Sequence, residues 1–538
     1  MIRPRVVAWT VALLITLPIA ALAQVDGQAV YDRWCAGCHG VEGRGDGPGA
    51  PTMLPRPRDF TTGLYQIRTT ATGELPTDQD LLHVIDVGMP GTAMPGWEEV
   101  LSGAERRALV EYLKTFSRFF EGESPTAIDF GRAPRASDDD IARGREVYDL
   151  IECWRCHGQQ GRGDGESAPT LVDDHDLPIV AVDLTENWRF TGGGTVEDIY
   201  RRLRTGLDGT PMPTFSDVVD AGVVTEQDLW ALAHYVRGLS PARPPEVREV
   251  VEAVLLTDRE VPQTIGDPVW QTADRFYIPL AGQVVIRPRW FNPRVDGLWA
   301  QAMHDGQDVA LLLSWTDPSE SPAPEWTEYA RRVLETMEPV DEGAATEPGA
   351  PDQLVVQFPQ TLPQGLERPY FLQGDSRRPA YLWTWQSGVA GAIESIARGL
   401  GTAAPQASGD QHLRAVAQHA DGQWQVLILR ALDTGDDGDL ALPVGRAVPM
   451  AFQAWEGDNG ESGSQGAVST WYFLFLRGRT PTAVYVAPPI ALALTLVLSV
   501  LVIRQARRSA GAGTQGAGGA SEAGHSEQNI AKNHRGIT

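Results

Sequence analysis

Two stretches of the chain, Cys35-Ala36-Gly37-Cys38-His39 and Cys153-Trp154-Arg155-Cys156-His157, share one pattern and use all four cysteines of the sequence. Two thiols at this spacing can add to the two vinyl groups of a haem, while the adjacent histidine binds the iron. A zinc site would need a further pair of ligands nearby, and a dithiol redox motif rarely carries a histidine at the same place twice. The pattern therefore predicts two covalently attached haems c. The expected attachment residues are Cys35, Cys38, Cys153 and Cys156, and the expected iron ligands are His39 and His157.

The two motifs belong to a repeat of 118 residues. Gly43–Gly47 recurs as Gly161–Gly165, and Met94 and Met212 each follow their motif histidine by 55 residues. A loop that carries a methionine over the open face of a haem supplies a thioether as the second axial ligand, which raises the reduction potential and closes the iron to small substrates. We therefore predict Met94 and Met212 as the distal iron ligands of two similar domains.

Other residues of suitable type are less well placed for the distal position. Met89 has no counterpart in the second copy, where Leu207 stands instead, and we interpret it as a packing residue. His83, His175 and His234 have no repeated partner, and we interpret them as ordinary surface or core residues.

Helical segments are expected on both sides of each motif. Apolar residues recur at helical spacing in the segments that close the two repeats, and helix-like segments also lead into both motifs. The expected helices are 28–34, 104–116, 143–152 and 226–239. This arrangement resembles the class I cytochromes c, in which a C-terminal helix packs across the N-terminal helix, and the resemblance covers residues 25–240. It implies cytochrome c domains at 24–122 and 136–242.

Both ends of the sequence carry signals for export or membrane insertion. Residues 1–23 combine a basic start, an apolar run and a final Ala-Leu-Ala, as a cleavable signal peptide does; an uncleaved anchor is the alternative. Residues 483–503 form an uncharged apolar run, long enough to cross a bilayer and followed by three arginines. The positive-inside rule then predicts a single-pass protein of a bacterial inner membrane, with its haem domains in the periplasm. The glycine- and serine-rich tail, 504–538, is expected to be cytoplasmic and disordered.

Residues 246–478 differ in texture from the repeats. Short alternating runs at 307–315, 354–358 and 424–430 predict strands, and Asp305-Gly306 and Asp421-Gly422 are typical of hairpin turns. We therefore expect an antiparallel β-sandwich. The predicted fold is multidomain, with two all-α cytochrome c domains, an all-β sandwich and one C-terminal transmembrane helix.

The same region contains aromatic stretches with a recognisable order. They are Leu313-Ser314-Trp315-Thr316-Asp317-Pro318, Pro369-Tyr370-Phe371, Leu382-Trp383-Thr384-Trp385, Ala451-Phe452-Gln453-Ala454-Trp455-Glu456-Gly457 and Ser469-Thr470-Trp471. These stretches resemble the haem b-binding subunit of the ethylbenzene dehydrogenase, dimethylsulfide dehydrogenase and selenate or chlorate reductase group. The resemblance implies a β-sandwich and, as partner, a molybdenum enzyme that exchanges electrons through iron–sulfur clusters.

The region departs from that group at the positions that would hold haem b. The group binds haem b between a methionine and a lysine, and the resemblance places Gln373-Gly374 and Gln465-Gly466-Ala467 at these positions. Residues 246–478 contain no lysine. Substitute ligands would have to come from Met303, His304, Met337, His412, His419 or Met450. Because a noncovalent haem needs axial ligands, we expect no haem b here.

The net charge of the chain and the predicted iron ligands limit the functions that the sequence supports. A net charge of −25 disfavours nucleic-acid binding. The leading hypothesis is an electron carrier, not itself an enzyme, that connects the respiratory chain with a periplasmic redox protein. A second hypothesis is a cytochrome fused to a sandwich that binds carbohydrate or protein through exposed tryptophans. A third is a peroxidase-like haem enzyme, which would need an open iron position that paired methionine ligands would close.

Overall fold

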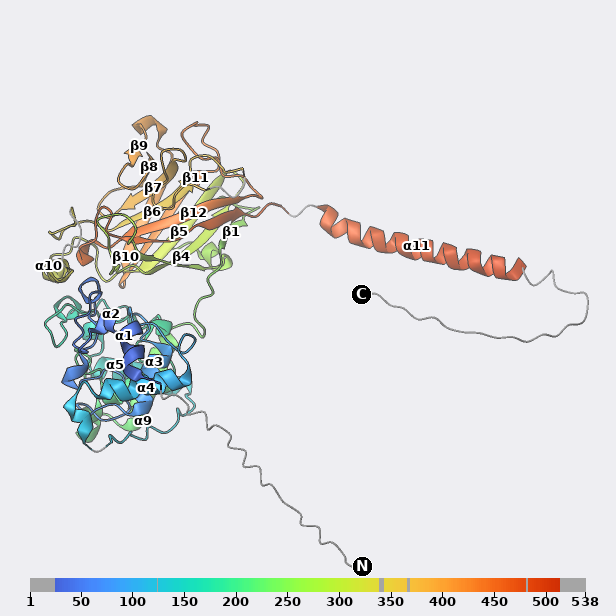
Figure 1. Ribbon diagram of the computed structural model, residues 1–538. Coiled ribbons are helices and arrows are strands. Elements are labelled where there is room, and N and C mark those ends of the chain that lie inside the picture. The colour runs from blue at the N-terminus through green and yellow to red at the C-terminus, as the bar shows by residue number, and fades with distance from the viewer. Residues whose placement is uncertain (1–24, 123, 338–342, 365–367, 480–481, 513–538) are drawn as a thin grey trace, which may run out of the picture. The chain divides into compact units, whose positions relative to one another are not determined.

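The computed structural model describes residues 25–122, 124–337, 343–364, 368–479 and 482–512. The predicted signal peptide, 1–23, and the part of the predicted disordered tail from residue 513 on lie outside these ranges. The chain forms two units, one up to Arg477 and one from Gly478 onward. The larger unit contains two helical domains and a β-sandwich, as predicted (Figure 1).

The two helical domains follow one plan. The first contains α1 (Gly27–Trp34), α2 (Ala36–His39), α3 (Asp78–Val87) and α4 (Gly103–Lys114), with the short 3-10 segments η1 (Ala50–Thr52), η2 (Phe60–Thr62) and η3 (Arg118–Glu121). The second contains α5 (Asp138–Leu150), α6 (Trp154–His157), α7 (Val196–Thr205), α8 (Ser216–Asp220) and α9 (Glu226–Leu239), with η4 (Ala168–Thr170) and η5 (Asn187–Arg189). The four predicted helices therefore form close to their expected bounds.

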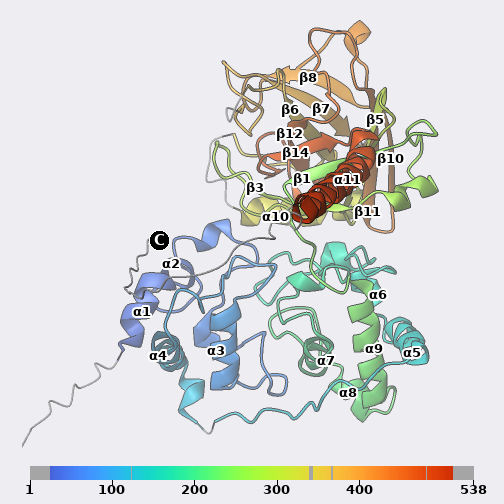
Figure 2. The same ribbon diagram turned by 90° about the vertical axis from the view of Figure 1, so that its right-hand side faces the viewer.

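In each domain the first and last helices cross at a glycine, and α5 and α9 show this crossing in Figure 2. A Cβ atom on Gly27 of α1 would lie 2.1 Å from the carbonyl oxygen of Ala108 in α4. A Cβ atom on Gly144 of α5 would lie 2.2 Å from the carbonyl oxygen of Ala231 in α9. Only glycine permits this approach, because the obstacle is backbone that cannot rotate away. The crossing is thus built in the same way twice.

The sandwich consists of two sheets that share strand β12. One sheet has the order β10-β11-β5-β4-β1-β14-β12, with β2 beside β4, and the other has β12-β6-β7-β8-β9, with β13 and β3 at β12. The first half of β12 pairs with β14 and its second half pairs with β6. The strands are β1 (Val250–Leu255), β2 (Phe276–Pro279), β3 (Ala281–Gly282), β4 (Gly297–His304), β5 (Asp308–Thr316), β6 (Gln353–Pro359), β7 (Ala380–Gln386), β8 (Ile393–Ala397), β9 (Ala404–Pro405), β10 (Arg414–Ala420), β11 (Gln423–Ala431), β12 (Ala447–Trp455), β13 (Ala467–Val468) and β14 (Tyr472–Leu476).

Two features of the sandwich differ from the expectation. Strand β1 is parallel to both of its neighbours, β4 and β14, so the sheet is mixed rather than purely antiparallel. The reason is topological: β1 is the first strand of the sandwich and pairs with no strand to which a hairpin connects it. A helix, α10 (Thr327–Thr336), also lies in the connection between β5 and β6, and its buried residues Tyr329, Val333 and Leu334 pack with Trp290 and Trp326.

The smaller unit is one long helix, α11 (Thr482–Ala512). Its segment Thr482–Ser509 is long and apolar enough to cross a membrane, with a mean hydropathy of 2.5. Its side chains are exposed, as expected for a surface that faces lipid rather than a protein core. The predicted span, 483–503, lies inside this helix.

Candidate haem centres

The first motif forms a helical turn that presents His39 to a loop of its own domain. Cys35 precedes α2, and His39 ends it. The Nδ1 atom of His39 lies 3.1 Å from the carbonyl oxygen of Arg58, and because a carbonyl only accepts, Nδ1 must carry the proton. The ring of Phe60 stacks on the imidazole, with centroids 4.5 Å apart. A histidine held through Nδ1 in this way offers Nε2 to a metal, so the residues fit a haem iron.

The second motif repeats this arrangement with a longer loop. His157 Nδ1–H donates to the carbonyl oxygen of Val182 at 3.1 Å. The acceptor follows its histidine by 25 residues here and by 19 residues in the first domain. The motif histidines and the methionines are each 118 residues apart in the two domains. The acceptor residues between them do not keep this distance. This local change explains why sequence periodicity did not find the two acceptor residues.

Burial shifts the pKa values of the histidines and of the first cysteine in both motifs. Desolvation lowers the pKa of His39 and of His157, so both imidazoles are held neutral, the form that binds a metal. Desolvation also raises the pKa of the Cys35 thiol and of the Cys153 thiol to about 12. Neither thiol is therefore activated by the protein itself, as a dithiol redox site would require.

The two predicted methionines occupy loops of the same conformation. The N–H of Met94 donates to Thr92 Oγ1 at 3.2 Å, and the N–H of Met212 donates to Thr210 Oγ1 at 3.2 Å. The carbonyl oxygens of Met94 and Met212 accept the N–H groups of the residues five positions earlier, at 3.0 and 3.1 Å. Both side chains are partly buried, and Met212 packs against the core of its domain.

The competing distal histidines are engaged elsewhere. His83 and His175 are exposed, and His234 Nε2–H donates to the carbonyl oxygen of Pro134 at 2.8 Å. Met89 takes part in the first methionine loop through its backbone N–H.

In the sandwich, the residue at the family's methionine position belongs to a buried amide network. Gln373 Nε2–H donates to Gln453 Oε1 at 3.0 Å, and the Gln373 N–H donates to Gln357 Oε1 at 2.8 Å. The side chain of Gln465, at the second position, accepts the N–H of Ala345. These amides satisfy one another with neutral hydrogen bonds, a chemistry unlike the thioether and amine that hold haem b in the family.

The substitute ligands do not converge on one place. Met303 and Met450 are buried in two different apolar clusters, and Met337 packs with a third. His304 Nε2–H donates to the carbonyl oxygen of Arg477, and His419 Nε2–H to that of Asp317, each at 2.9 Å. His412 lies beside Asp436.

The sandwich also contains a buried acidic cluster that sequence analysis missed. Asp317, Asp352 and Glu456 each place a carboxylate oxygen within 4.8 Å of the others, so they could hold a metal ion. Desolvation raises the pKa of all three carboxyl groups, and it raises the pKa of the neighbouring Asp458 to about 6. The cluster joins the end of β5, the start of β6 and the end of β12, and no sequence spacing connects these three places.

Most tryptophans of the sandwich are core residues. Trp315, Trp383, Trp385 and Trp424 belong to the main apolar cluster, and the Nε1–H of Trp424 donates to Asp352. Among the described residues, no tryptophan of the sandwich is exposed. The exposed aromatic side chains of the sandwich include Phe291 and Tyr370, so the exposed tryptophans of the second hypothesis are not found among these residues.

Comparison with known families agrees with this geometry. Residues 24–117 and 141–240 match the family described as cytochrome c. Both helical domains are cytochrome c domains. They therefore bind haem c covalently, as expected. Residues 397–467 of the sandwich match the family described as ethylbenzene dehydrogenase.

Curated relatives of the chain include subunits of respiratory reductases. A protein of Haloferax mediterranei, provisionally named a respiratory nitrate reductase heme subunit, is 22% identical over 41% of this chain and 70% of its own length. The chlorate reductase subunit gamma of Ideonella dechloratans is 25% identical over 33% of this chain and 64% of its own length. A chain of the Kuenenia stuttgartiensis reducing HAO-like protein complex is 43% identical over 40% of this chain and 96% of its own, with a TM-score of 0.38. The protein is thus a multihaem cytochrome c related to the haem subunits of respiratory reductases.

Proposed function

We propose that the protein is a membrane-anchored, periplasmic dihaem cytochrome that passes single electrons between the respiratory chain and a periplasmic oxidoreductase. The observation that supports this most directly is the duplicated centre: two motif histidines oriented through Nδ1 and two methionine loops of one conformation. Each haem, when bound, supplies a one-electron couple. The chain's residues fix the ligands, keep the histidines neutral and exclude water from the core.

The assignment of residues is part of this proposal. Cys35, Cys38, Cys153 and Cys156 attach the haems, His39 and His157 are the proximal ligands, and Met94 and Met212 are the distal ligands. Two thioether ligands leave neither iron an open position, which favours electron transfer over peroxidase chemistry.

The sandwich serves, in this proposal, as a docking surface for a catalytic partner and holds no haem b. The buried Gln357–Gln373–Gln453 network and the scattered substitute ligands support this reading. A molybdenum enzyme with iron–sulfur clusters is the partner that the family match favours.

A haem count tests the proposal. An alkaline pyridine haemochrome spectrum of the full chain, with protein quantified in parallel, should show two c-type haems per chain. Replacing Cys35 and Cys38 with alanine should remove one of them, and replacing Cys153 and Cys156 should remove the other. A b-type peak at one haem per chain would contradict the docking-surface assignment, and mutation of Met303, His304 and Met450 would then locate its ligands.

Topology is tested separately. A chain that ends before Pro481 lacks α11 and should be released from the periplasm in soluble form with both haems, whereas the full chain should need detergent. Recovery of the shortened chain only in membranes would contradict the single C-terminal anchor.

A further inference from the structure

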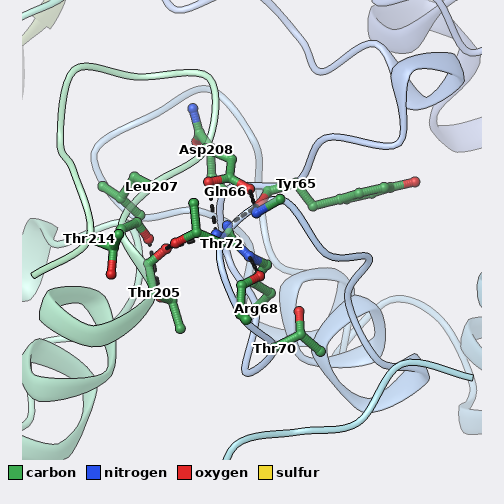
Figure 3. Close-up of polar contacts among 12 residues, drawn as sticks. Tyr65, Gln66, Arg68, Thr70, Thr72, Thr205, Leu207, Asp208 and Thr214 are labelled. Atoms are coloured by element: carbon green, nitrogen blue, oxygen red, sulfur yellow. Dashed lines mark hydrogen bonds and ion pairs between the residues drawn. The ribbon is translucent and has the colours of Figure 1, made fainter. Parts of the chain in front are cut away.

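The two cytochrome c domains meet at a buried arginine (Figure 3). Arg68 is fully buried and lies in the segment 65–73, and the repeat distance of 118 residues places Glu186 at its position in the second domain. Its Nη2–H groups donate to the carbonyl oxygen of Thr205 at 2.7 Å and to Asp208 Oδ1 at 2.8 Å, both in the second domain. The Nε and Nη1 groups donate to carbonyl oxygens of its own segment. The guanidinium therefore connects the two domains through direct hydrogen bonds.

Further hydrogen bonds make the contact reciprocal. Thr72 Oγ1–H donates to the carbonyl oxygen of Thr205 at 2.9 Å, and the N–H of Gly73 donates to Asp208 Oδ2 at 3.0 Å. In the opposite direction, Arg202 of α7 donates to the carbonyl oxygen of Arg68 at 2.8 Å. We call residues 65–73 with Arg202, Thr205 and Asp208 the domain latch. Charge-assisted hydrogen bonds in a buried setting are stronger than neutral surface bonds, so the domain latch should resist separation of the two domains.

The domain latch binds the base of the Met212 loop through hydrogen bonds. Thr205 is the last residue of α7, and Asp208 lies inside the loop, four positions before Met212. The N–H of Leu207, between them, donates to the carbonyl oxygen of Met212 at 3.1 Å. A shift of the Met212 backbone would therefore disturb the bonds that Thr205 and Asp208 make with Arg68.

The Met94 loop is supported differently: the ion pair at its base, between Asp86 and Arg106, lies within the first domain and does not involve the second. Pro90 stands at the repeat position of Asp208 and has no side-chain acceptor. In its place, Thr191 Oγ1–H donates to the carbonyl oxygen of Pro90 at 3.3 Å, and Gly91 approaches the backbone of Arg189. One long neutral hydrogen bond thus stands where the second domain has a charged, buried cluster.

We propose that Arg68 is a positioning residue for the second haem centre: the first domain holds Met212 on its iron through the domain latch, which makes the Met212–iron bond the firmer of the two and the Met94–iron bond the labile one. This inference rests on the proposed role of Met94 and Met212 as distal ligands. It makes the potential and ligand stability of the second centre depend on the first domain.

An alkaline titration of the oxidised full chain tests the inference, because methionine leaves ferric iron as other ligands take its place at high pH. The charge-transfer band at the red end of the spectrum reports the Met–iron bond. Arg68→Gln is placed in a Met94→Ala background, where only the second centre retains the band, and in a Met212→Ala background, where only the first does. We expect the midpoint for the second centre to fall by about one pH unit, which corresponds to a tenfold loss in ligand stability, and the first to stay unchanged.

Arg44→Gln is the matched control, since Arg44 is an exposed arginine of the same domain that pairs with the exposed Glu42. Asp208→Asn should shift the second centre in the same direction as Arg68→Gln. Equal midpoints in Arg68→Gln and the parent would overturn the inference. If Arg68→Gln does not fold, Thr72→Val removes one bond of the latch, and an unchanged midpoint in both Thr72→Val and Asp208→Asn would overturn it. Persistence of the band in Met94→Ala/Met212→Ala would instead contradict the ligand assignment, so the two failures are distinguishable.

Discussion

The two cytochrome c domains share a haem frame and differ in what surrounds it. In both, a glycine lets the terminal helices cross, a backbone carbonyl orients the motif histidine, and a threonine shapes the methionine loop. The second domain, however, is held by the first domain at its methionine loop and by the sandwich at its histidine loop, where Thr316 Oγ1–H donates to Asp183 at 2.6 Å. The difference teaches that duplication preserves the centre while the unrepeated segments decide how each centre is embedded.

The largest expected effect comes from replacing one methionine at a time, which should change one haem centre and leave the other as it is. Met94→Ala and Met212→Ala should each abolish one of two low-spin His/Met centres without loss of covalent haem, because the thioether is lost while the cysteines remain. Each variant should lose about half of the red charge-transfer absorbance and lower one of the two potentials. Met89→Leu is the control, since it installs the residue that the second domain has at this place. An unchanged band in either alanine variant would refute that ligand.

The helix crossing offers a second comparison. Gly27→Ala and Gly144→Ala should each destabilise their own domain by about 1–3 kcal/mol, because the new Cβ atom would meet a backbone oxygen that cannot move without shifting a helix. Gly238→Ala in α9 is the control: its Cβ atom would meet nothing within 4 Å, and alanine should stabilise the helix slightly. Denaturant unfolding followed by haem absorbance measures the change, and similar midpoints for Gly144→Ala and Gly238→Ala would show that the crossing tolerates a side chain.

The sandwich should differ from the first cytochrome c domain in its response to pH, whereas in the second domain burial likewise raises the pKa of Glu186 to about 7. Burial raises the pKa of Asp458 to about 6 and that of Glu461 to about 7, so the unfolded chain releases these protons at lower pH than the folded chain. Their contribution to stability is therefore fully present below about pH 4 and is lost as the pH rises through 6 and 7. We expect the thermal midpoint of the sandwich, followed by tryptophan fluorescence, to fall by on the order of 5 °C over this range.

Glu456→Gln should flatten that pH dependence, because burial keeps the Glu456 carboxyl protonated in the folded chain and glutamine removes a proton that the unfolded chain would release. Glu325→Gln, at an exposed position, should leave it unchanged. A sandwich midpoint that rises between pH 4 and 7 would contradict the sign of these pKa changes.

The smallest expected effect concerns the contact between the sandwich and the second domain. Asp183 follows Val182, whose carbonyl oxygen accepts the hydrogen bond from His157 Nδ1–H. Thr316→Val removes the hydroxyl that donates to Asp183, so its carboxylate carries more unshielded charge and favours the oxidised iron. Potentiometry should show the second haem lowered by on the order of 20 mV, against 59 mV for a tenfold change in a one-electron couple, and the first haem unmoved.

The haem-binding residues could be predicted from the sequence, but the contacts that surround them could not. Cys-x-x-Cys-His and the repeated methionines are local signals with a fixed chemistry, so they could be read directly. Arg58 and Val182 were not predicted because the loops before them differ in length, and Arg68 was not predicted because the repeat position in the second domain is Glu186. The acidic cluster comes from three distant strand ends, which only the folded sheets bring together. The parallel placement of β1 escaped for the same reason, since local alternation does not reveal strand direction.

The pairing of β1 has a consequence for how the protein is made. This strand leads out of the second cytochrome c domain and must wait for β14, the last strand before the membrane helix, to cover one of its edges. Such non-local pairing is slow to form, and an open strand edge invites association with other chains. During export, the haem domains can mature while the sandwich is still incomplete. A chain cut off before Tyr472 would therefore present finished cytochromes attached to an aggregation-prone sheet.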